Sequence, residues 1–536
     1  MRLTDAPYAT FRKPVLASNG AVATSQPLAA QAGLDILRRG GNAVDAAVAT
    51  AVALTVVEPT SNGIGGDLFA LVWKDGQLHG LNASGRAFSG SDAEALRAQG
   101  HRTMPASGWA AVTVPGAPSG WSALLERFGT MAPDVVMGSA IGYAEDGFPV
   151  SPTVSQLWAG AATRFLAMSG REFAGWAEVF APGGRAPAAG ERWRSPGHAA
   201  TLRRLAAKGF DDFYQGALAE TMVAYSNATG GVISADDLAA HVCEWVDPIS
   251  ATYHGHEVWE IPPNGQGIAA LMTLAMLEDL DLAQYPHLSA ESWHLQMEAM
   301  KVAFADAHEY VADPAMADVP TEQLLSKEYI AARAREIGDT AKVQTPGVLP
   351  SGGTVFLVTA DRDGNMVSLI QSNYQGFGSG VVVPDAGIAL HNRGLGFSLT
   401  PGHRNELMPG KRPFHTIIPG FVTKGGAPLG PFGVMGAPMQ PQGHVQVVLS
   451  TVDHGLNPQA ALDAPRWRVL HGLDAVVESS IPYEMHRGLA GRGHRLLEPH
   501  NVDPFPFGRG QIIWRLEDGV YACGTEPRTD GCVAAY

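Results

Sequence analysis

One threonine in this sequence has the surroundings that self-activating catalysis requires. Thr354 follows a flexible pair of glycines that ends at Gly353, and an apolar run, 355–358, comes directly after it. The polar turn 362–365 and a second apolar run, 366–370, predict a β-hairpin that begins at this threonine. If the bond between Gly353 and Thr354 is cut, one residue gains both a hydroxyl nucleophile and an α-amine that can act as its base.

The same residues also fit an ordinary hairpin. Threonine favours strands, and many strands that do no chemistry begin with Gly-Thr-Val. On that interpretation the chain is a non-enzymatic scaffold that is never processed. The two interpretations differ in whether the bond before Thr354 is intact on a denaturing gel.

The elements predicted around this hairpin include both helices and strands. Two helices are expected near the N-terminus, one capped by Ser25 and one by Asn42, and a longer amphipathic helix covers 293–307. The stretch 168–195 is rich in Gly, Pro and Ala and predicts a surface excursion. Besides the hairpin that turns at 362–364, hairpins are predicted at 68–81 and around 424–426 and 517–519. Strands with a few packed helices are typical of a layered mixed fold.

The composition argues against several classes of partner. The chain has 536 residues, 46% of them hydrophobic, and a formal net charge of −15. A chain of this length can bury a large core. No basic stripe occurs, which argues against nucleic acid or an anionic membrane surface as a partner.

The cysteines and the N-terminal sequence predict a cytoplasmic protein. Cys243, Cys523 and Cys532 are too few for a disulfide framework, and free thiols are expected, although the last two could pair in an oxidising compartment. Residues 1–14 contain no apolar stretch of the kind found in a secretory signal. The most apolar run, 46–57, is too short to span a bilayer.

The residue patterns of other catalytic classes are missing or incomplete. His294 and Glu298 share a helical face, but Lys301 follows one turn later and no His-Glu-x-x-His motif occurs. The glycine-rich segments 63–66 and 376–380 lack the Lys-Ser/Thr ending of a phosphate loop. No Gly-x-Ser-x-Gly elbow stands in a strand-turn-helix context. We therefore expect neither a metal nor a cofactor.

Ordered blocks along nearly the whole chain resemble the γ-glutamyltransferase family of N-terminal nucleophile hydrolases. The segment from Thr354 is similar to the start of the family's small subunit. Blocks similar to the large subunit stand at 17–24, 34–48, 58–67, 114–116, 143–149 and 298–306. The resemblance implies an α+β fold, the αββα sandwich, in which two stacked antiparallel sheets are covered by helices. It also implies a large subunit, 1–353, and a small subunit, 354–536, that form one intertwined unit, and a dimer of such units is compatible with it.

The resemblance assigns catalytic roles to four residues. Thr354 is the nucleophile after autocatalytic cutting of the Gly353–Thr354 bond, and Ser372 stands where a hydroxyl bonds to the nucleophile. Gly436 and Ala437 match the family's Gly-Gly pair, whose backbone N–H groups stabilise the oxyanion. Ala437 keeps that N–H, provided that the local φ suits a residue with a Cβ. Judged from the residues alone, Ser372 is an ordinary strand serine and 436–437 a plain loop.

The residues that hold a γ-glutamyl group in the family are changed in this chain. The family's arginine in Arg-Glu-x-Ala-Pro has its counterpart in Arg86, displaced by two positions. Tyr374 occupies the place of an asparagine, and Asn373 is adjacent to it. The resemblance therefore makes Arg86, Asn373 and Tyr374 candidate substrate-binding residues.

Two later segments also depart from the family pattern. Gly396 stands where the family has an aspartate that binds the substrate amine, so Gly396→Asp is expected to improve the use of an ammonium-bearing amide. His415 and Thr416 replace a serine pair and are candidate substrate-binding residues. For His415 three roles stay open: a packed polar residue, a substrate donor or a proton relay.

Arg393 is a positive charge that this chain has in addition to the family pattern. A site without the aspartate should bind an ammonium group poorly, whereas a guanidinium can hold a carboxylate through two parallel hydrogen bonds. We therefore expect Arg393 to favour an anionic substrate. The alternative is that Arg393 belongs to a salt bridge at the surface or between subunits.

These departures resemble a divergent branch of the family that includes oxamate amidohydrolase. The shared patterns are His-Asn-Arg-Gly, Lys-Arg-Pro-x-His-Thr and Met-Gly-x-x-Met-Gln-Pro-Gln-Gly-His. The resemblance implies hydrolysis of a small carboxylate-bearing amide, such as oxamate, through an acyl-enzyme. A glutathione or γ-glutamyl hydrolase or transpeptidase is the second interpretation, and a cephalosporin-type acylase is the third.

Overall fold

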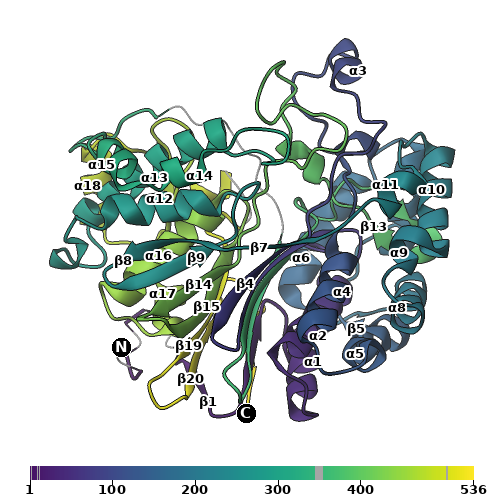
Figure 1. Cartoon of the computed structure of the whole chain (residues 1–536), viewed down its shortest axis with the longest axis horizontal. Helices are drawn as coiled ribbons and strands as arrows, with labels where there is room; N and C mark the ends of the chain where they lie inside the picture. The colour runs from purple at the N-terminus through teal and green to yellow at the C-terminus, as the bar shows by residue number, and fades with distance from the viewer. Residues whose placement is uncertain (2, 6, 9, 11, 345–353, 502–504) are drawn as a thin grey trace.

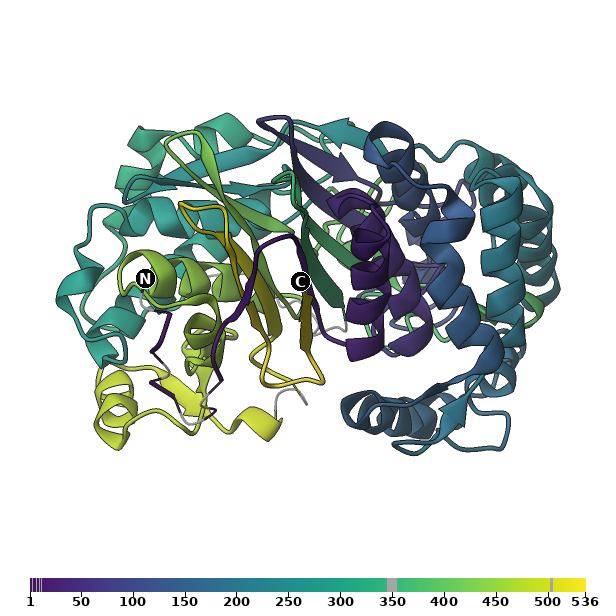
Figure 2. The same ribbon diagram turned by 90° about the horizontal axis from the view of Figure 1, so that it is seen from below.

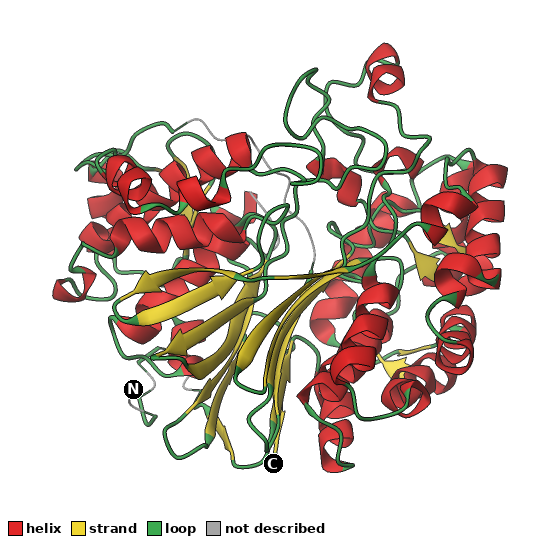
Figure 3. Cartoon of the chain, in the orientation of Figure 1, coloured by secondary structure: helices red, strands yellow, loops and turns green. Residues whose placement is uncertain are grey.

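Two seven-stranded antiparallel sheets stack at the centre of the molecule, and helices cover the outer face of each sheet (Figures 1 and 3). The structure is a computed structural model that describes all residues except 2, 6, 9, 11, 345–353 and 502–504. The order of the layers, helix, sheet, sheet, helix, confirms the predicted αββα sandwich.

The first sheet carries the hairpin that begins after Thr354. Its strands, in spatial order, are β21 (Cys532–Ala535), β2 (Ala21–Thr24), β10 (Val355–Ala360), β11 (Met366–Ser372), β3 (Asp67–Lys74), β4 (Gln77–Asn82) and β7 (Glu244–Val246). The hairpin therefore lies in the middle of the sheet, with β2 beside β10 and β3 beside β11.

The second sheet packs against the first. Its strands, in spatial order, are β1 (Val15–Ala17), β20 (Tyr521–Thr525), β19 (Arg509–Arg515), β15 (Ala427–Met435), β14 (Gly420–Lys424), β9 (His256–Glu260) and β8 (Ile249–Tyr253). Both sheets combine strands from before Thr354 with strands from after it. Neither sheet is complete without both parts of the chain.

Strand β10 is apolar throughout because both of its faces are covered. Val355 and Leu357 point to the helical layer and belong to the hydrophobic core formed with α1 and α2. Phe356 and Val358 point the other way and belong to the core between the two sheets. The alternation follows from the two-residue period of a strand, and a strand buried on both faces reads as a continuous apolar run.

The helices form two covering layers (Figures 1 and 2). Helices α1 (Pro27–Arg38), α2 (Ala43–Val57), α4 (Ala117–Phe128), α5 (Pro133–Asp146) and α8 (Pro196–Lys208) lie on the side of the first sheet, and α12 (Gly267–Leu277), α13 (Ala290–Tyr310) and α16 (Met439–Val452) on the side of the second. Further helices are α3 (Ala93–Ala98), α6 (Pro152–Phe165), α7 (Ala174–Phe180), α9 (Asp212–Gln215), α10 (Ala217–Thr229), α11 (Ala235–Ala239), α14 (Thr321–Leu324), α15 (Lys327–Ala334), α17 (Pro458–Asp463) and α18 (Tyr483–Gly491). Further short strands are β5 (Phe148–Pro149), β6 (Arg192–Trp193), β12 (Val382–Val383), β13 (Ile388–Ala389), β16 (Trp467–Val469), β17 (Asp474–Val477) and β18 (Arg495–Leu497).

The predicted helix caps are right at one helix and wrong at the other. Asn42 caps α2 through a capping box with Asp45. Helix α1 is capped by Gln26, whose side chain accepts from two backbone N–H groups. The hydroxyl of Ser25 donates to the carboxylate of Glu58 instead, and this explains why the predicted cap fails.

Most of the stretch 168–195 lies at the surface, as its composition suggested, but it is anchored by α7, whose Trp176 and Phe180 are buried. Their rings lie 5.3 and 4.7 Å from the ring of Phe377, which follows the hairpin of the first sheet. In the part of the chain that the structure describes, no helix combines the length and the apolar character needed to cross a bilayer.

Candidate active site

Thr354 directly precedes β10 and lies buried opposite Ser372. The strand register pairs Val355 with Gln371, so Thr354, one residue before Val355, faces Ser372, one residue after Gln371. The hydroxyl oxygens of Thr354 and Ser372 are 2.9 Å apart. Thr354 is 1% exposed. The hydroxyl of Ser372 also accepts the backbone N–H of Tyr374 at 2.7 Å, which fixes its position. Gly353, the other side of the predicted cleavage bond, lies outside the described residues.

The same register brings an acidic residue beside Ser372. On the other side of β11, strand β3 pairs its first residue, Asp67, with Ser372. Thr354, Ser372 and Asp67 therefore stand in one row across three neighbouring strands, whose spacing is about 4.8 Å. Asp67 was not among the site residues expected from the sequence.

Asp67 is the centre of a buried polar cluster. Arg393 donates to its two oxygens from Nε (2.8 Å) and Nη2 (3.2 Å), and His391 Nδ1 and His415 Nε2 lie 3.1 and 3.0 Å from Oδ2. Arg393 Nη1 donates to Thr416 Oγ1 at 2.8 Å. We call Asp67, His391, Arg393, His415 and Thr416 the Asp67 cluster.

Within this cluster, the charges of Asp67 and Arg393 offset each other near neutral pH. Burial would raise the pKa of Asp67, but Arg393 and then His415 outweigh burial and hold it well below its usual value. Burial, together with the charge of Arg393, lowers the pKa of His415 to about 4. Asp67 is therefore ionised and His415 neutral, so the guanidinium is matched by one carboxylate.

The Arg393 salt bridge is buried and lies within the chain. It joins a residue before Thr354 to a residue after it, so the expected surface location is wrong, and a bridge between the two predicted subunits fits. The guanidinium carbon also lies 4.4 Å from the centre of the Tyr374 ring, a cation–π contact. Burial raises the pKa of Tyr374 to about 12, which keeps its hydroxyl protonated. Direct binding of a substrate anion by Arg393 stays a prediction.

The side-chain amide of Asn373 is buried and has no hydrogen-bond partner among the described residues. It packs beside two glycines, because a Cβ on Gly63 would lie 3.2 Å from its Nδ2 and one on Gly66 would lie 3.1 Å from its Oδ1. Buried polar atoms are normally paired, so this amide is available to a ligand or a water. Contact between Asn373 and the substrate stays a prediction.

Arg86 is held outside the Asp67 cluster. Its guanidinium pairs with Asp313 at 2.8 Å and Glu244 at 3.4 Å, and it donates to the carbonyl of Gly410 at 3.0 Å. None of these partners belongs to the cluster, and the side chain is 34% exposed. The structure therefore does not bring Arg86 together with the other candidate substrate-binding residues, and its contacts explain it as a brace between loops.

The loop at Gly436 and Ala437 connects β15 to α16. Gly436 has a φ of +136° and Ala437 a φ of +51°, so Ala437 adopts the left-handed conformation that favours glycine. In the described part of the chain, the backbone N–H of neither residue donates to an acceptor. The two free donors lie just before the N-terminus of a 14-residue helix, whose dipole favours negative charge. This arrangement suits a developing oxyanion.

The left-handed alanine gives a stability prediction. Replacing Ala437 with glycine relieves about 1–2 kcal/mol of backbone strain and costs about 0.4–1 kcal/mol through the freer unfolded chain. We expect Ala437→Gly to leave the free energy of unfolding unchanged or to raise it by up to about 1 kcal/mol. Ala275→Gly, inside α12, is the control and should lose about 1 kcal/mol in the same urea titration. Equal losses of unfolding free energy in Ala437→Gly and Ala275→Gly would contradict the claim that Ala437 is strained.

Gly396 has no room for the acid that the sequence comparison placed there. A Cβ on this residue would lie 2.2 Å from the carbonyl oxygen of Phe414 and 3.0 Å from Cβ of Pro413. The expectation that Gly396→Asp improves the use of an ammonium-bearing amide is therefore not supported by the structure.

We expect Gly396→Asp to destabilise the protein by at least about 2 kcal/mol, because the backbone of residue 414 must move. No gain on a γ-glutamyl amide should accompany the loss. Gly160→Asp is the control, since a Cβ at Gly160 meets nothing within 4 Å. Thermal unfolding of both variants and turnover of a γ-glutamyl anilide check this. A variant that is stable and more active on that amide would restore the sequence-based expectation.

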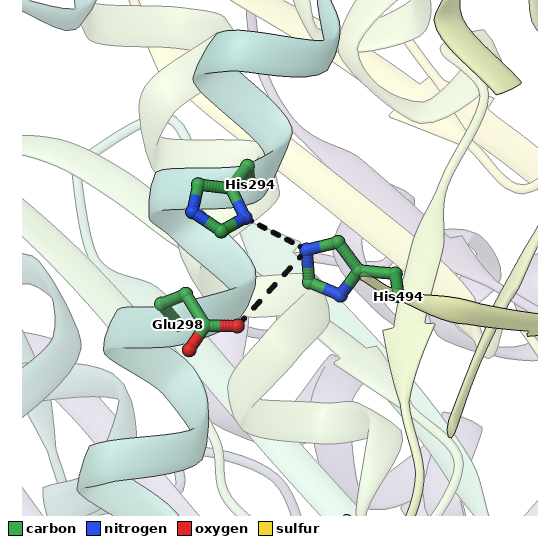
Figure 4. Close-up of side chains that lie close together, drawn as sticks. All are labelled: His294, Glu298 and His494. Carbon is green, nitrogen blue, oxygen red and sulfur yellow. Dashed lines mark hydrogen bonds and ion pairs between the residues drawn. The ribbon is translucent and has the colours of Figure 1, made fainter. Parts of the chain in front are cut away.

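One group of side chains among the described residues has metal-ligand chemistry. His294 Nδ1 lies 2.9 Å from His494 Nε2, which is 4.0 Å from Glu298 Oε1 (Figure 4). However, Lys301 Nζ lies 2.5 Å from the same carboxylate oxygen. The ammonium group of Lys301 thus pairs with the Glu298 carboxylate at the place where a metal would bind. Catalysis without a metal stays a prediction.

Comparison with known proteins agrees with this geometry. The sequence model described as Gamma-glutamyltranspeptidase matches residues 29–536. The chain is 37% identical to the glutathione hydrolase-like YwrD proenzyme of Bacillus subtilis and 36% identical to the oxamate amidohydrolase proenzyme of Klebsiella pneumoniae, in each case over 97% of this chain and 99% of the relative. The crystal structure of a cephalosporin acylase from Bacillus halodurans superposes with a TM-score of 0.95 and 53% identity, covering 100% of this chain and 99% of that one.

Proposed function

Because the chain belongs to the gamma-glutamyltranspeptidase family of N-terminal nucleophile hydrolases, we propose that it cuts itself before Thr354 and then hydrolyses an amide through that residue. The buried hydrogen bond between Thr354 and Ser372 is the observation that carries this proposal. It places a fixed hydroxyl directly before a central strand, β10, at the position that would become the new N-terminus. Two relatives described as proenzymes support the same maturation.

The proposed reaction uses a small number of groups. Thr354 Oγ1 attacks the amide carbonyl carbon while the α-amine of the same residue takes the hydroxyl proton; an α-amine with an ordinary pKa of about 7.7–8.0 suits this role. The N–H groups of Gly436 and Ala437 stabilise the oxyanion. When the carbon–nitrogen bond breaks, the leaving amine takes that proton, and an ester to Thr354 remains. Water, deprotonated by the α-amine, then attacks the ester carbon. The bond from that carbon to Thr354 Oγ1 breaks, the α-amine returns the proton to Oγ1, and the acid is released.

A small amide that carries a carboxylate, of which oxamate is an example, is the substrate class that we propose. The crowding at Gly396 leaves no place for an acid that would hold a substrate ammonium. The charge of Arg393 is offset by the carboxylate of Asp67, so we propose that a substrate carboxylate is held mainly by hydrogen bonds. The unpaired amide of Asn373 and guanidinium N–H groups of Arg393 that do not face Asp67 or Thr416 are donors of the right kind.

A second candidate function is the removal of a larger acyl group, as in an acylase. A cavity of about 460 Å³ lies beside the Arg393–Gly396 turn; its walls include Leu395, Phe397 and Phe414 but none of the proposed catalytic residues. This volume is within the range of sites for drug-sized ligands and exceeds what oxamate needs. The similarity to the Bacillus halodurans cephalosporin acylase supports the same candidate.

A panel of amides on matured protein tests the proposal. Ammonia release from oxamate, turnover of a γ-glutamyl anilide and cleavage of an N-acyl cephalosporin should be compared as kcat/KM, each normalised to the amount of new N-terminal threonine. We expect the γ-glutamyl anilide to be poorer than the best of the other two by at least about tenfold, the value of one lost charge contact. Preference for the anilide would reject the substrate class, and no cleavage of any amide by fully cut protein would reject the function.

A further inference from the structure

One glutamine side chain connects the two loops of the candidate active site. Gln266 stands at the N-terminus of α12, and its side chain is fully buried. Its Nε2 donates to the carbonyl oxygen of Thr416 at 2.6 Å and to that of Ala437 at 2.9 Å. Its backbone N–H donates to the carbonyl of His415, also at 2.9 Å. Three hydrogen bonds from one residue thus connect the Asp67 cluster to the loop at Gly436 and Ala437.

A primary amide suits this position chemically. The NH₂ group of glutamine offers two donors on one nitrogen, so it can bind two carbonyl oxygens that converge on it. The backbone fixes the residue in place, because Gly265 pairs with His415 and the N–H of His415 donates to the carbonyl of Asn264 at 2.9 Å. A methionine or leucine would fill the same space but leave two buried carbonyl groups with fewer donors.

The bond to the Ala437 carbonyl bears directly on the oxyanion donors. Ala437 holds a left-handed φ that an alanine leaves readily. A donor on its carbonyl restrains its ψ, and the rotation of this residue sets the direction of the preceding peptide, whose N–H is one of the two free donors. The backbone N–H of Gln440 donates to the same carbonyl at 3.1 Å, while Gln440 Oε1 accepts the N–H of Ile418 at 2.9 Å. The loop is thus tied twice to the segment 415–418.

We infer that Gln266 is a positioning residue for the proposed amide hydrolysis. It clips the loop of His415 and Thr416 to the loop of Gly436 and Ala437 and keeps the oxyanion donors aimed, without touching the substrate. The inference rests on the proposed function, because only that function assigns oxyanion stabilisation to the N–H groups of Gly436 and Ala437. A misplacement of donors by about 1 Å can cost about a hundredfold in rate.

The test compares Gln266→Met with a matched control, Gln446→Met. Gln446 is also buried, and its Nε2 also donates to two backbone carbonyls, those of Gln442 and Trp467, both at 3.0 Å. Both variants should lose thermal stability. Only Gln266→Met should lower kcat, by about ten- to a hundredfold, with KM changed less than about threefold, on the best amide of the panel and per mole of new N-terminal threonine. Equal kcat values in the two variants would overturn the inference.

A second readout separates positioning from plain stability. If Gln266 acts by holding Ala437 left-handed, the loss of kcat on Gln266→Met should be at least about threefold smaller in an Ala437→Gly background, where the left-handed conformation carries no penalty. An equal loss in both backgrounds would reject this mechanism. Failure of the proposed function looks different, because the wild-type protein would then fail to cut itself or to hydrolyse any amide.

Discussion

Replacing Thr354 with alanine is expected to leave one uncut chain of 536 residues and to abolish amide hydrolysis. The substitution removes the only group that the proposal assigns to the attack, both on the bond after Gly353 and on the substrate. The loss of turnover should be a factor on the order of 10³ or more, since removing a nucleophile leaves only what binding and the oxyanion donors supply. Denaturing electrophoresis and mass spectrometry of the purified protein measure the first effect, and the amide panel measures the second.

Thr359→Ala is the matched control for this variant. Thr359 lies on the same strand and is also buried, and its hydroxyl donates to the carbonyl of Ala43 at 2.7 Å. This control should lose about 1–2 kcal/mol of stability and still be cut into 1–353 and 354–536. Thr354→Ser keeps a hydroxyl and should also be cut. Two normal fragments from Thr354→Ala would refute the assigned site, and an uncut control would mean that strand β10 must be intact for any cleavage.

Removing Arg393 is expected to have the second largest effect, on stability as well as on binding. Arg393→Ala leaves the buried carboxylate of Asp67 without its guanidinium, and breaking one side of a buried ion pair costs about 3–5 kcal/mol. The variant Asp67→Asn/Arg393→Gln removes both charges and should recover at least half of that loss. Urea unfolding of the wild type and both variants measures this. A loss below about 1 kcal/mol in the single variant would show that the pair contributes little.

The stability of Arg393→Ala should also fall as the pH rises. In the wild type Asp67 has a depressed pKa, so its contribution is present above the unfolded value near 3.9 and is lost only as the pH falls through the folded value. Without Arg393, burial dominates, and the cluster takes up a proton on Asp67 or on His415 in the folded state. A group with a raised pKa stabilises at low pH, so the variant should be more stable near pH 5 than near pH 8, the opposite of the wild-type contribution.

The kinetics of the double variant separate two roles of Arg393. If the residue only balances Asp67, the neutral pair should restore KM for a carboxylate-bearing amide together with the fold. If Arg393 also binds the substrate anion, KM should stay at least about tenfold above the wild-type value while stability recovers. This comparison decides between the anion anchor expected from the sequence and the structural salt bridge found here.

Much of the fold could be predicted because its signals are local. The hairpin after Thr354 follows from two apolar runs around a short polar turn, whereas the pairing that places Thr354 opposite Ser372 is known only from the structure. The cap at Asn42 follows equally from three residues. The cap at Ser25 could not be predicted, because a partner 33 residues away, Glu58, takes its hydroxyl.

The candidate site was predictable in its nucleophile and not in its electrostatics. Asp67 and Arg393 are 326 positions apart, and no local pattern shows that the first residue of β3 and the turn 393–396 come within 2.8 Å of each other. The crowding at Gly396 arises from the close approach of a backbone carbonyl, which composition and spacing do not reveal. Gln266 carried no chemical signal of its own, since its importance lies in two carbonyls that converge on it.

Each of the two sheets contains strands from both sides of Thr354, and this affects what happens to the protein after the chain is cut. Neither product could leave without exposing the edges of β10 and β14 and the apolar faces that bury Phe356 and Leu357. Cleavage of the peptide bond would therefore leave the fold unchanged. The two fragments would stay associated on dilution, unfold together in one thermal transition and not exchange with the fragments of another molecule.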